Sequence, residues 1–187
     1  MVARSEYVIA AVGLLLGLTA CTPATTATPS AIITPTPSVT SPSVTTSPTP
    51  TWSTDQQAAV KQVETYYRVF NEVMRQERHP NDLATVARND ALAEAQRTFN
   101  EFGMAGLTVK GEVVASDLVP GALRTMNDRP TVRVKLCDDS RGWSVVDDSG
   151  KDILAGSAKV IRPLVSSVQS WDGDWYVTRF AKGDHTC

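Results

Sequence analysis

An uncharged segment rich in threonine, serine and proline restricts where this 187-residue chain can fold. Residues 22–54 hold twelve Thr, six Ser and seven Pro among 33 residues, with no charge and no Gly. So few large apolar side chains cannot offset the entropy lost on ordering, and the repeated Thr-Pro and Ser-Pro pairs favour extended backbone. We therefore expect a disordered linker here and one folded domain over 55–187, which is 133 residues long.

The first 20 residues have the features of an export signal. Arg4 and the free amine give a positive start, and an apolar run follows over 8–18. This run has 11 residues, whereas a helix needs about 20 apolar residues to span a membrane. The segment 1–20 is therefore predicted to be a signal peptide rather than a stable membrane span.

The end of this segment, Leu18-Thr19-Ala20-Cys21, resembles the bacterial lipobox. The resemblance implies cleavage between Ala20 and Cys21, and attachment of a diacylglycerol carrying fatty acids such as palmitate to the Cys21 thiol. Residues 21–54 would then be a lipidated cysteine and its linker, on the extracytoplasmic face of the cell membrane. The alternative is an ordinary secretory signal followed by a chance cysteine.

A helical pattern opens the predicted domain. Apolar and aromatic residues recur at intervals of three or four over 60–74, which predicts a helix with one buried face. Thr54 and Gln57 have capping-box spacing at its start, and Pro80 predicts that it ends before that residue.

Two shorter helices are predicted next. Asn81 or Asp82 would cap the second, and Asn89 or Asp90 would cap the third, which ends near Gly103. The later part of the chain alternates between apolar and polar residues, which is typical of half-buried strands. The predicted strands cover 108–119, 131–137, 143–146, 159–171 and 175–180. Helices followed by an antiparallel sheet make an α+β fold.

The last two strands carry the most distinctive motif, Trp171-Asp172-Gly173-Asp174-Trp175-Tyr176-Val177. Asp172-Gly173 predicts a type I′ turn, across which Trp171 and Trp175 are expected to meet. This motif and the tyrosine-rich first helix are similar to the nuclear transport factor two-like family, also called the SnoaL-like or cystatin-like α+β cone. The resemblance covers 55–187 and implies three helices packed on a curved antiparallel sheet, with a pocket between them.

Family enzymes use an Asp, His or Tyr in that pocket, so the resemblance makes Tyr66, Tyr67 and Asp117 the candidate pocket residues. We assign no catalytic residue and expect no cofactor, because the chain lacks the H-E-x-x-H, G-x-S-x-G, P-loop and G-x-G-x-x-G motifs. The expected function is a non-enzymatic binding or interaction domain in the cell envelope. The alternatives are a SnoaL-like enzyme acting on a small molecule, and a phage or prophage exclusion lipoprotein.

The three cysteines have separate predicted roles. With Cys21 lipidated, Cys137 and Cys187 remain, and an exported protein meets oxidising conditions, so we expect a disulfide between them. No metal site is expected. His79 and His185 lack a ligand partner at metal spacing, and the aspartates over 138–152 are better explained as turn residues than as a calcium site.

Partner classes follow from charge and from the tryptophans. The net charge is −2, whereas nucleic-acid binding requires a basic surface, so no nucleic acid is expected. Trp171 and Trp175 are a candidate binding surface, although tryptophans on strands more often pack within the sheet. The expected partners are the membrane, through the lipid anchor, and an envelope protein, a wall component or a small apolar ligand.

Overall fold

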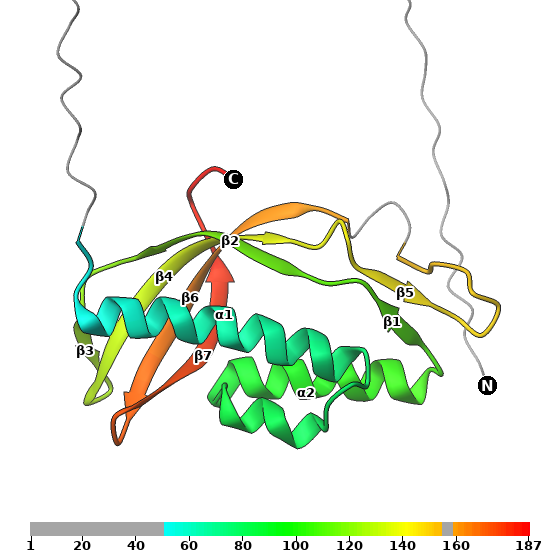
Figure 1. Cartoon of the computed structure of the whole chain (residues 1–187), viewed down its shortest axis with the longest axis horizontal. Coiled ribbons are helices and arrows are strands. Elements are labelled where there is room, and N and C mark those ends of the chain that lie inside the picture. The colour runs from blue at the N-terminus through cyan, green and yellow to red at the C-terminus, as the bar shows by residue number, and fades with distance from the viewer. Residues whose placement is uncertain (1–50, 155–158) are drawn as a thin grey trace, which may run out of the picture. The chain divides into compact units, whose positions relative to one another are not determined.

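The computed structural model describes residues 51–154 and 159–187, and shows the predicted α+β fold, with helices followed by a mostly antiparallel sheet (Figure 1). The predicted signal peptide, Cys21 and most of the predicted linker lie outside the described residues. The helices are α1 (Thr54–Met74), the 3-10 helix η1 (Pro80–Thr85) and α2 (Asn89–Met104). None of the helices in the described ranges is long and apolar enough to cross a membrane.

Helix α1 begins with a capping box one residue earlier than predicted. The backbone N–H of Ser53 donates to Gln56 Oε1 over 2.8 Å, and the N–H of Gln56 donates to Ser53 Oγ over 3.3 Å. Ser53 and Gln56 therefore satisfy amides that the helix leaves unpaired. The preceding Trp52 packs against the core, so the folded region starts slightly before residue 55.

The two later helices start differently from the prediction. His79, and not Asn81 or Asp82, caps η1, because its Nδ1 accepts a hydrogen bond from the N–H of Asn81 over 3.2 Å. Arg88, and not Asn89 or Asp90, is the N-cap of α2, and it makes no side-chain cap hydrogen bond.

Seven strands follow in the described ranges, and one predicted strand is divided. They are β1 (Thr108–Lys110), β2 (Val114–Pro120), β3 (Arg124–Met126), β4 (Arg129–Asp139), β5 (Ser144–Val146), β6 (Ile161–Trp171) and β7 (Asp174–Lys182). The predicted strand over 108–119 breaks at Gly111, which has φ +73° and lies so close to Gly142 that a Cβ would sit 1.9 Å from its carbonyl oxygen. The short β3 was not predicted.

The main sheet has the order β2-β4-β6-β7, and β3 pairs with β4 on the same sheet, while β1 and β5 form a separate pair. Figure 1 shows α1 and α2 on one side of the main sheet. The predicted alternation in β4 is confirmed. Val132, Val134 and Leu136 are fully buried toward the helices, and Arg133 and Lys135 are exposed on the other side. We call these two sides the inner and the outer face.

The turn between β6 and β7 has the predicted backbone but not the predicted tryptophan contact. Asp172 and Gly173 have φ values of +53° and +94°, as a type I′ turn requires. The register pairs Trp171 with Asp174 and Ser170 with Trp175. Because successive residues of a strand face opposite sides of a sheet, Ser170 and its partner Trp175 face one side and Trp171 faces the other, so the prediction that the tryptophans meet is wrong.

Candidate functional site

The inner face holds two of the three predicted pocket residues. Tyr66 and Tyr67 on α1 are 6% and 7% exposed. The Tyr66 ring lies 5.2 Å from that of Phe180 on β7 and 5.9 Å from that of Phe70, measured between centroids. The Tyr67 ring lies 5.9 Å from Phe180 in an edge-on arrangement. Aromatic rings therefore occupy the space between α1 and β7.

A buried carboxylate binds the Tyr67 hydroxyl. Tyr67 Oη donates to Asp138 Oδ1 over 2.9 Å, and Arg162 Nε donates to Asp138 Oδ2 over 2.7 Å. Asp138 is 2% exposed, and an ionised carboxylate at such a position requires a charged or hydrogen-bonded partner. Both of its oxygens are therefore engaged, one from the helix and one from the neighbouring strand β6.

Burial determines the protonation of the two tyrosines. Removal from water raises the pKa of Tyr66 and that of Tyr67, and the negative charge of Asp138 raises both further. The phenols therefore keep their protons at neutral pH. Chemically, Tyr67 acts as a hydrogen-bond donor to a carboxylate that is already ion-paired.

The role of Asp138 differs from the predicted one, which grouped this residue with the turn aspartates. The available signal was the period of two: Asp138 continues the series Val132, Val134 and Leu136, so it must lie on the inner face. The interpretation as turn residues does hold for Asp147, whose Oδ1 accepts hydrogen bonds from the backbone N–H groups of Ser149 and Lys151.

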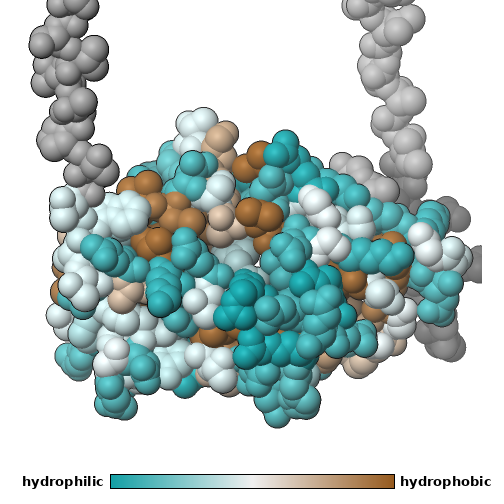
Figure 2. Space-filling model, in the orientation of Figure 1, coloured by the Kyte–Doolittle hydropathy of each residue, from teal (hydrophilic) through white to brown (hydrophobic). Residues whose placement is uncertain are grey.

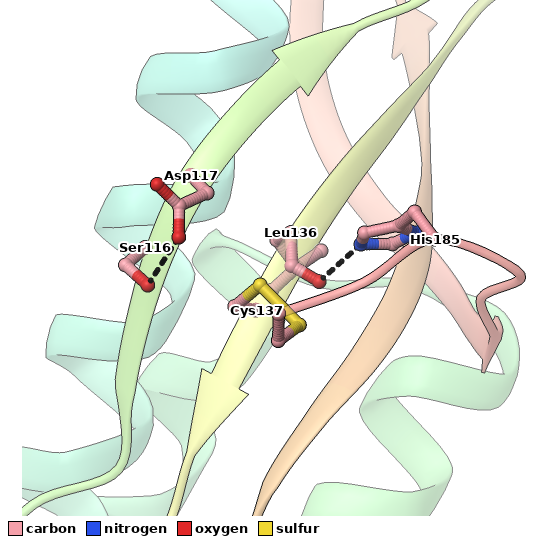
Figure 3. Close-up of a disulfide and its surroundings, with 6 residues drawn as sticks. Ser116, Asp117, Leu136, Cys137 and His185 are labelled. Carbon is pink, nitrogen blue, oxygen red and sulfur yellow. Dashed lines mark hydrogen bonds between the residues drawn. A yellow bond between two sulfur atoms is a disulfide. The ribbon is translucent and has the colours of Figure 1, made fainter. Parts of the chain in front are cut away.

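The third predicted pocket residue, Asp117, lies elsewhere. It is exposed, with φ +51°, where the β2–β4 register shifts between Ser116 and Val119. Its carboxylate accepts a 3.3 Å hydrogen bond from Ser116 Oγ, as Figure 3 shows. The prediction that Asp117 lines the pocket is corrected, because an irregularity of this kind reorients the side chains of a strand.

The predicted disulfide is confirmed. Cys137 on β4 and Cys187 are bonded, with Cα atoms 5.6 Å apart. The bond holds the C-terminal segment 183–187 over the sheet, where His185 Nε2 lies 3.1 Å from the carbonyl oxygen of Leu136 (Figure 3). The N–H of Gly183 donates to the carbonyl of Pro163 over 2.9 Å.

A ring nitrogen of His185 and the sulfurs of Cys137 and Cys187 lie within 4.8 Å of one another, which is close enough for a shared metal ion. Thiolates are the form of cysteine that binds metals. Because both sulfurs belong to the disulfide, they offer no thiolate in this state of the protein.

The candidate tryptophan surface is divided between the two faces. Trp175 is half-buried and packs against the main core. On the outer face, the Trp171 ring meets the Tyr176 ring edge-on, with centroids 5.8 Å apart, and the Arg129 guanidinium carbon lies 4.6 Å from the Trp171 ring centroid. The two rings therefore do not form one stacking platform.

A groove of about 760 Å³ lies over the outer face, in a region that sequence analysis did not single out. We call it the outer groove. Alternate residues of β4 form part of its lining, the segment 119–126 forms another part, and Asp184 of the C-terminal segment also lines it. The basic residues in its lining are Arg124, Arg133 and Lys135. The available signal was the exposed alternation of Arg133 and Lys135 along β4.

Comparison with known proteins identifies the fold only. No protein-family model matches the chain, and no curated protein matches it either. The intermembrane space region of the chloroplast protein ARC6 is similar, with a TM-score of 0.50 and 13% identity, over 70% of this chain and 97% of that chain. The transfer protein TraH of the Gram-positive conjugative plasmid pIP501 has a TM-score of 0.41 and 14% identity, over 72% and 98%. The likeness to ARC6 shows a similar α+β fold.

Proposed function

We propose that this chain is an exported lipoprotein whose domain over 55–187 binds another component of the cell envelope without catalysing a reaction. The lipobox-like Leu18-Thr19-Ala20-Cys21 supports the export and the anchor. The Cys137–Cys187 disulfide agrees with an oxidising compartment. A linker of 33 residues rich in Thr, Ser and Pro would let the domain reach partners away from the membrane surface.

The observation that carries the non-enzymatic part is the state of Asp138. A general base must come within hydrogen-bond distance of its substrate. Asp138 is 2% exposed and is held by hydrogen bonds from Tyr67 and Arg162, and Asp117 is exposed on β2. These contacts favour a scaffold role for the inner face over the SnoaL-like enzyme alternative.

We also propose that the domain is a member of the nuclear transport factor two-like family. The tight turn at Asp172-Gly173, flanked by Trp171 and Trp175, supports this assignment. So does the arrangement of α1 and α2 on one side of an antiparallel sheet. In this family the pocket lies between the helices and the sheet, a region that Tyr66, Tyr67 and Phe180 occupy here.

Anchoring is tested by metabolic labelling with radioactive palmitate and by membrane fractionation. The full chain is expected to incorporate label and to sediment with membranes. Cys21→Ala should remain an unlabelled precursor or leave the membrane, whereas Cys187→Ala should be labelled like the natural chain. A labelled, mature Cys21→Ala protein in the membrane fraction would contradict the anchor.

Binding is tested by cross-linking in intact cells followed by a pull-down of the full chain from its own envelope. We expect a component that co-purifies in reproducible stoichiometry and is absent from a tag-only control. Recovery of no component above that control, in repeated cross-linking with reagents of different length, would contradict an interaction role.

A further inference from the structure

The basic residues of the outer groove have few partners within the protein. Among residues 51–154 and 159–187, Arg124 and Arg133 form no ion pair or side-chain hydrogen bond. The other described arginines contact a carboxylate, a backbone carbonyl or an aromatic ring. Lys135 lies 3.7 Å from Asp184, and both side chains are exposed. Exposed pairs of this kind contribute little, so the groove presents three cations to a ligand.

Two of these cations, Arg133 and Lys135, lie on β4, and the third, Arg124, lies on the neighbouring strand β3. Arg124 is paired with Thr131, and Thr131, Arg133 and Lys135 are alternate residues of β4. Alternate residues of a strand are about 6.6–6.8 Å apart and share a face. An extended peptide places its own alternate side chains at the same interval, so acidic groups at every second position would match the three cations.

Apolar side chains contribute the rest of the binding surface. Val119 and Met126 line the groove and are 53% and 43% exposed, and the buried Val165 also lines it. Val119 and Pro120 belong to the end of β2, and Figure 2 shows hydrophobic patches over the part of the molecule where β2 lies in Figure 1. A ligand with aliphatic groups between its acidic groups would remove this surface from water.

We propose that the outer groove binds an extended segment of a partner protein in which acidic residues alternate with aliphatic ones. This inference rests on the proposed interaction function and specifies its surface. A free inorganic anion would leave the apolar lining uncovered, and a flat bilayer would meet a concave surface poorly. An extended acidic–aliphatic peptide satisfies both the charge and the apolar lining.

Asp184 is the acidic residue in the groove lining and competes with this ligand. Its carboxylate lies next to Lys135. An acidic side chain of the partner would take that same position. Removing the Asp184 charge should therefore strengthen binding, whereas removing the charges of Arg133 and Lys135 should weaken it. A general loss of stability would weaken binding in all of these variants, so it would not explain stronger binding on removal of the Asp184 charge.

The test uses the full chain in neutral detergent micelles and a fluorescein-labelled twelve-residue peptide of alternating Glu and Val, with binding followed by fluorescence anisotropy. We expect the double variant Arg133→Gln/Lys135→Gln to bind at least tenfold more weakly and Asp184→Asn to bind two- to fivefold more tightly. Arg179→Gln is the matched control. It removes a charge from the same face of the sheet at a position paired with Ser167, outside the groove lining, and should change affinity less than twofold.

Two further probes test the ligand class. A Glu/Val peptide with the same composition but separate Glu and Val blocks should bind several-fold more weakly, and an alternating Lys/Val peptide should not bind. The proposal is overturned if the double variant binds like the natural chain, or if the block peptide binds as well as the alternating one. Stronger binding to phosphatidylglycerol vesicles, lost in the double variant, would assign the groove to a lipid and also overturn it.

The same double variant separates this inference from the proposed function. If the envelope component still co-purifies with Arg133→Gln/Lys135→Gln in the pull-down, the interaction function stands and the outer groove is not its site. If no component co-purifies with either chain, the interaction function itself fails.

Discussion

Tyr67 on α1 and Asp138 on β4 are joined by a 2.9 Å hydrogen bond across 71 positions of sequence. Asp138 also pairs with Arg162 on β6, so one buried carboxylate connects the first helix with two strands of the sheet. Removing one partner of a buried ion pair destabilises a protein much more than the intact pair stabilises it. The contact therefore fixes how α1 sits on the inner face.

Removing the Tyr67 hydroxyl should destabilise the domain. Tyr67→Phe keeps the ring and leaves Asp138 Oδ1 without its donor, which should lower the free energy of unfolding by about 1–3 kcal/mol. Tyr66→Phe is the matched control, because the Tyr66 hydroxyl makes no hydrogen bond to any residue in the described ranges, and should cost less than about 1 kcal/mol. Urea unfolding of the two variants measures the difference, and equal losses would contradict the role of the hydrogen bond.

Stability should fall at alkaline pH because of the two buried tyrosines. Burial raises the pKa of Tyr66 and of Tyr67 in the folded protein, whereas a phenol in the unfolded chain loses its proton near pH 10. Above about pH 10 the unfolded state therefore binds fewer protons than the folded state. The contribution of the two tyrosines to the free energy of unfolding is fully present below about pH 10. Above it, each tyrosine contributes a fall of up to about 1.4 kcal/mol per pH unit. Denaturant unfolding between pH 8 and 11.5 measures this decline, which should be shallower in Tyr66→Phe/Tyr67→Phe.

The two tryptophans near the turn should differ in their contribution to stability. Trp175 packs against the core, so Trp175→Ala should cost about 3 kcal/mol. Trp171 contacts Tyr176 and Arg129 on the outer face, so Trp171→Ala should cost about 1 kcal/mol. The melting temperatures of the two variants measure this difference. An unchanged melting temperature for Trp175→Ala would instead identify Trp175 as a binding residue.

Two glycines with positive φ should respond differently to alanine. Gly173 has φ +94° with open space around its Cα, so Gly173→Ala should cost about 1–2 kcal/mol of backbone strain. Gly111 has φ +73° and faces the Gly142 carbonyl oxygen, which a Cβ would approach to 1.9 Å. Gly111→Ala must move backbone and should cost at least about 3 kcal/mol. Thermal melts followed by circular dichroism compare the two variants. A larger loss of stability for Gly173→Ala than for Gly111→Ala would contradict this prediction.

Reduction of the disulfide should destabilise the domain without unfolding it outright. The bond joins positions 50 residues apart. Closing a loop of that length restricts the unfolded chain and so stabilises the folded state by about 4 kcal/mol. Guanidinium unfolding with and without a phosphine reductant measures the loss. Alkylation of the denatured, unreduced chain should modify neither Cys137 nor Cys187, and modification of either would show that the bond does not form in the exported protein.

Much of the fold follows from local patterns that the sequence displays directly. The end of α1 before Pro80, the alternation along β4 and the type I′ turn at Asp172-Gly173 were all predicted correctly. Each depends on residues within one turn or one strand, where periodicity and backbone preference act alone. The disulfide was predicted because the predicted lipidation of Cys21 leaves one pair of cysteines, Cys137 and Cys187.

By itself, then, the sequence determined the order of the elements, their buried sides and the cysteine pairing. Tertiary structure decided the contacts between elements. The close approach of Gly142 breaks the strand at Gly111, the register shift in β2 exposes Asp117, and the register of β6 and β7 separates Trp171 from Trp175. Tertiary structure also brought Asp138 beneath Tyr67 and assembled the outer groove from distant segments. These outcomes depend on register and on contacts across dozens of residues, and a one-residue change in register reverses the face of every side chain in a strand.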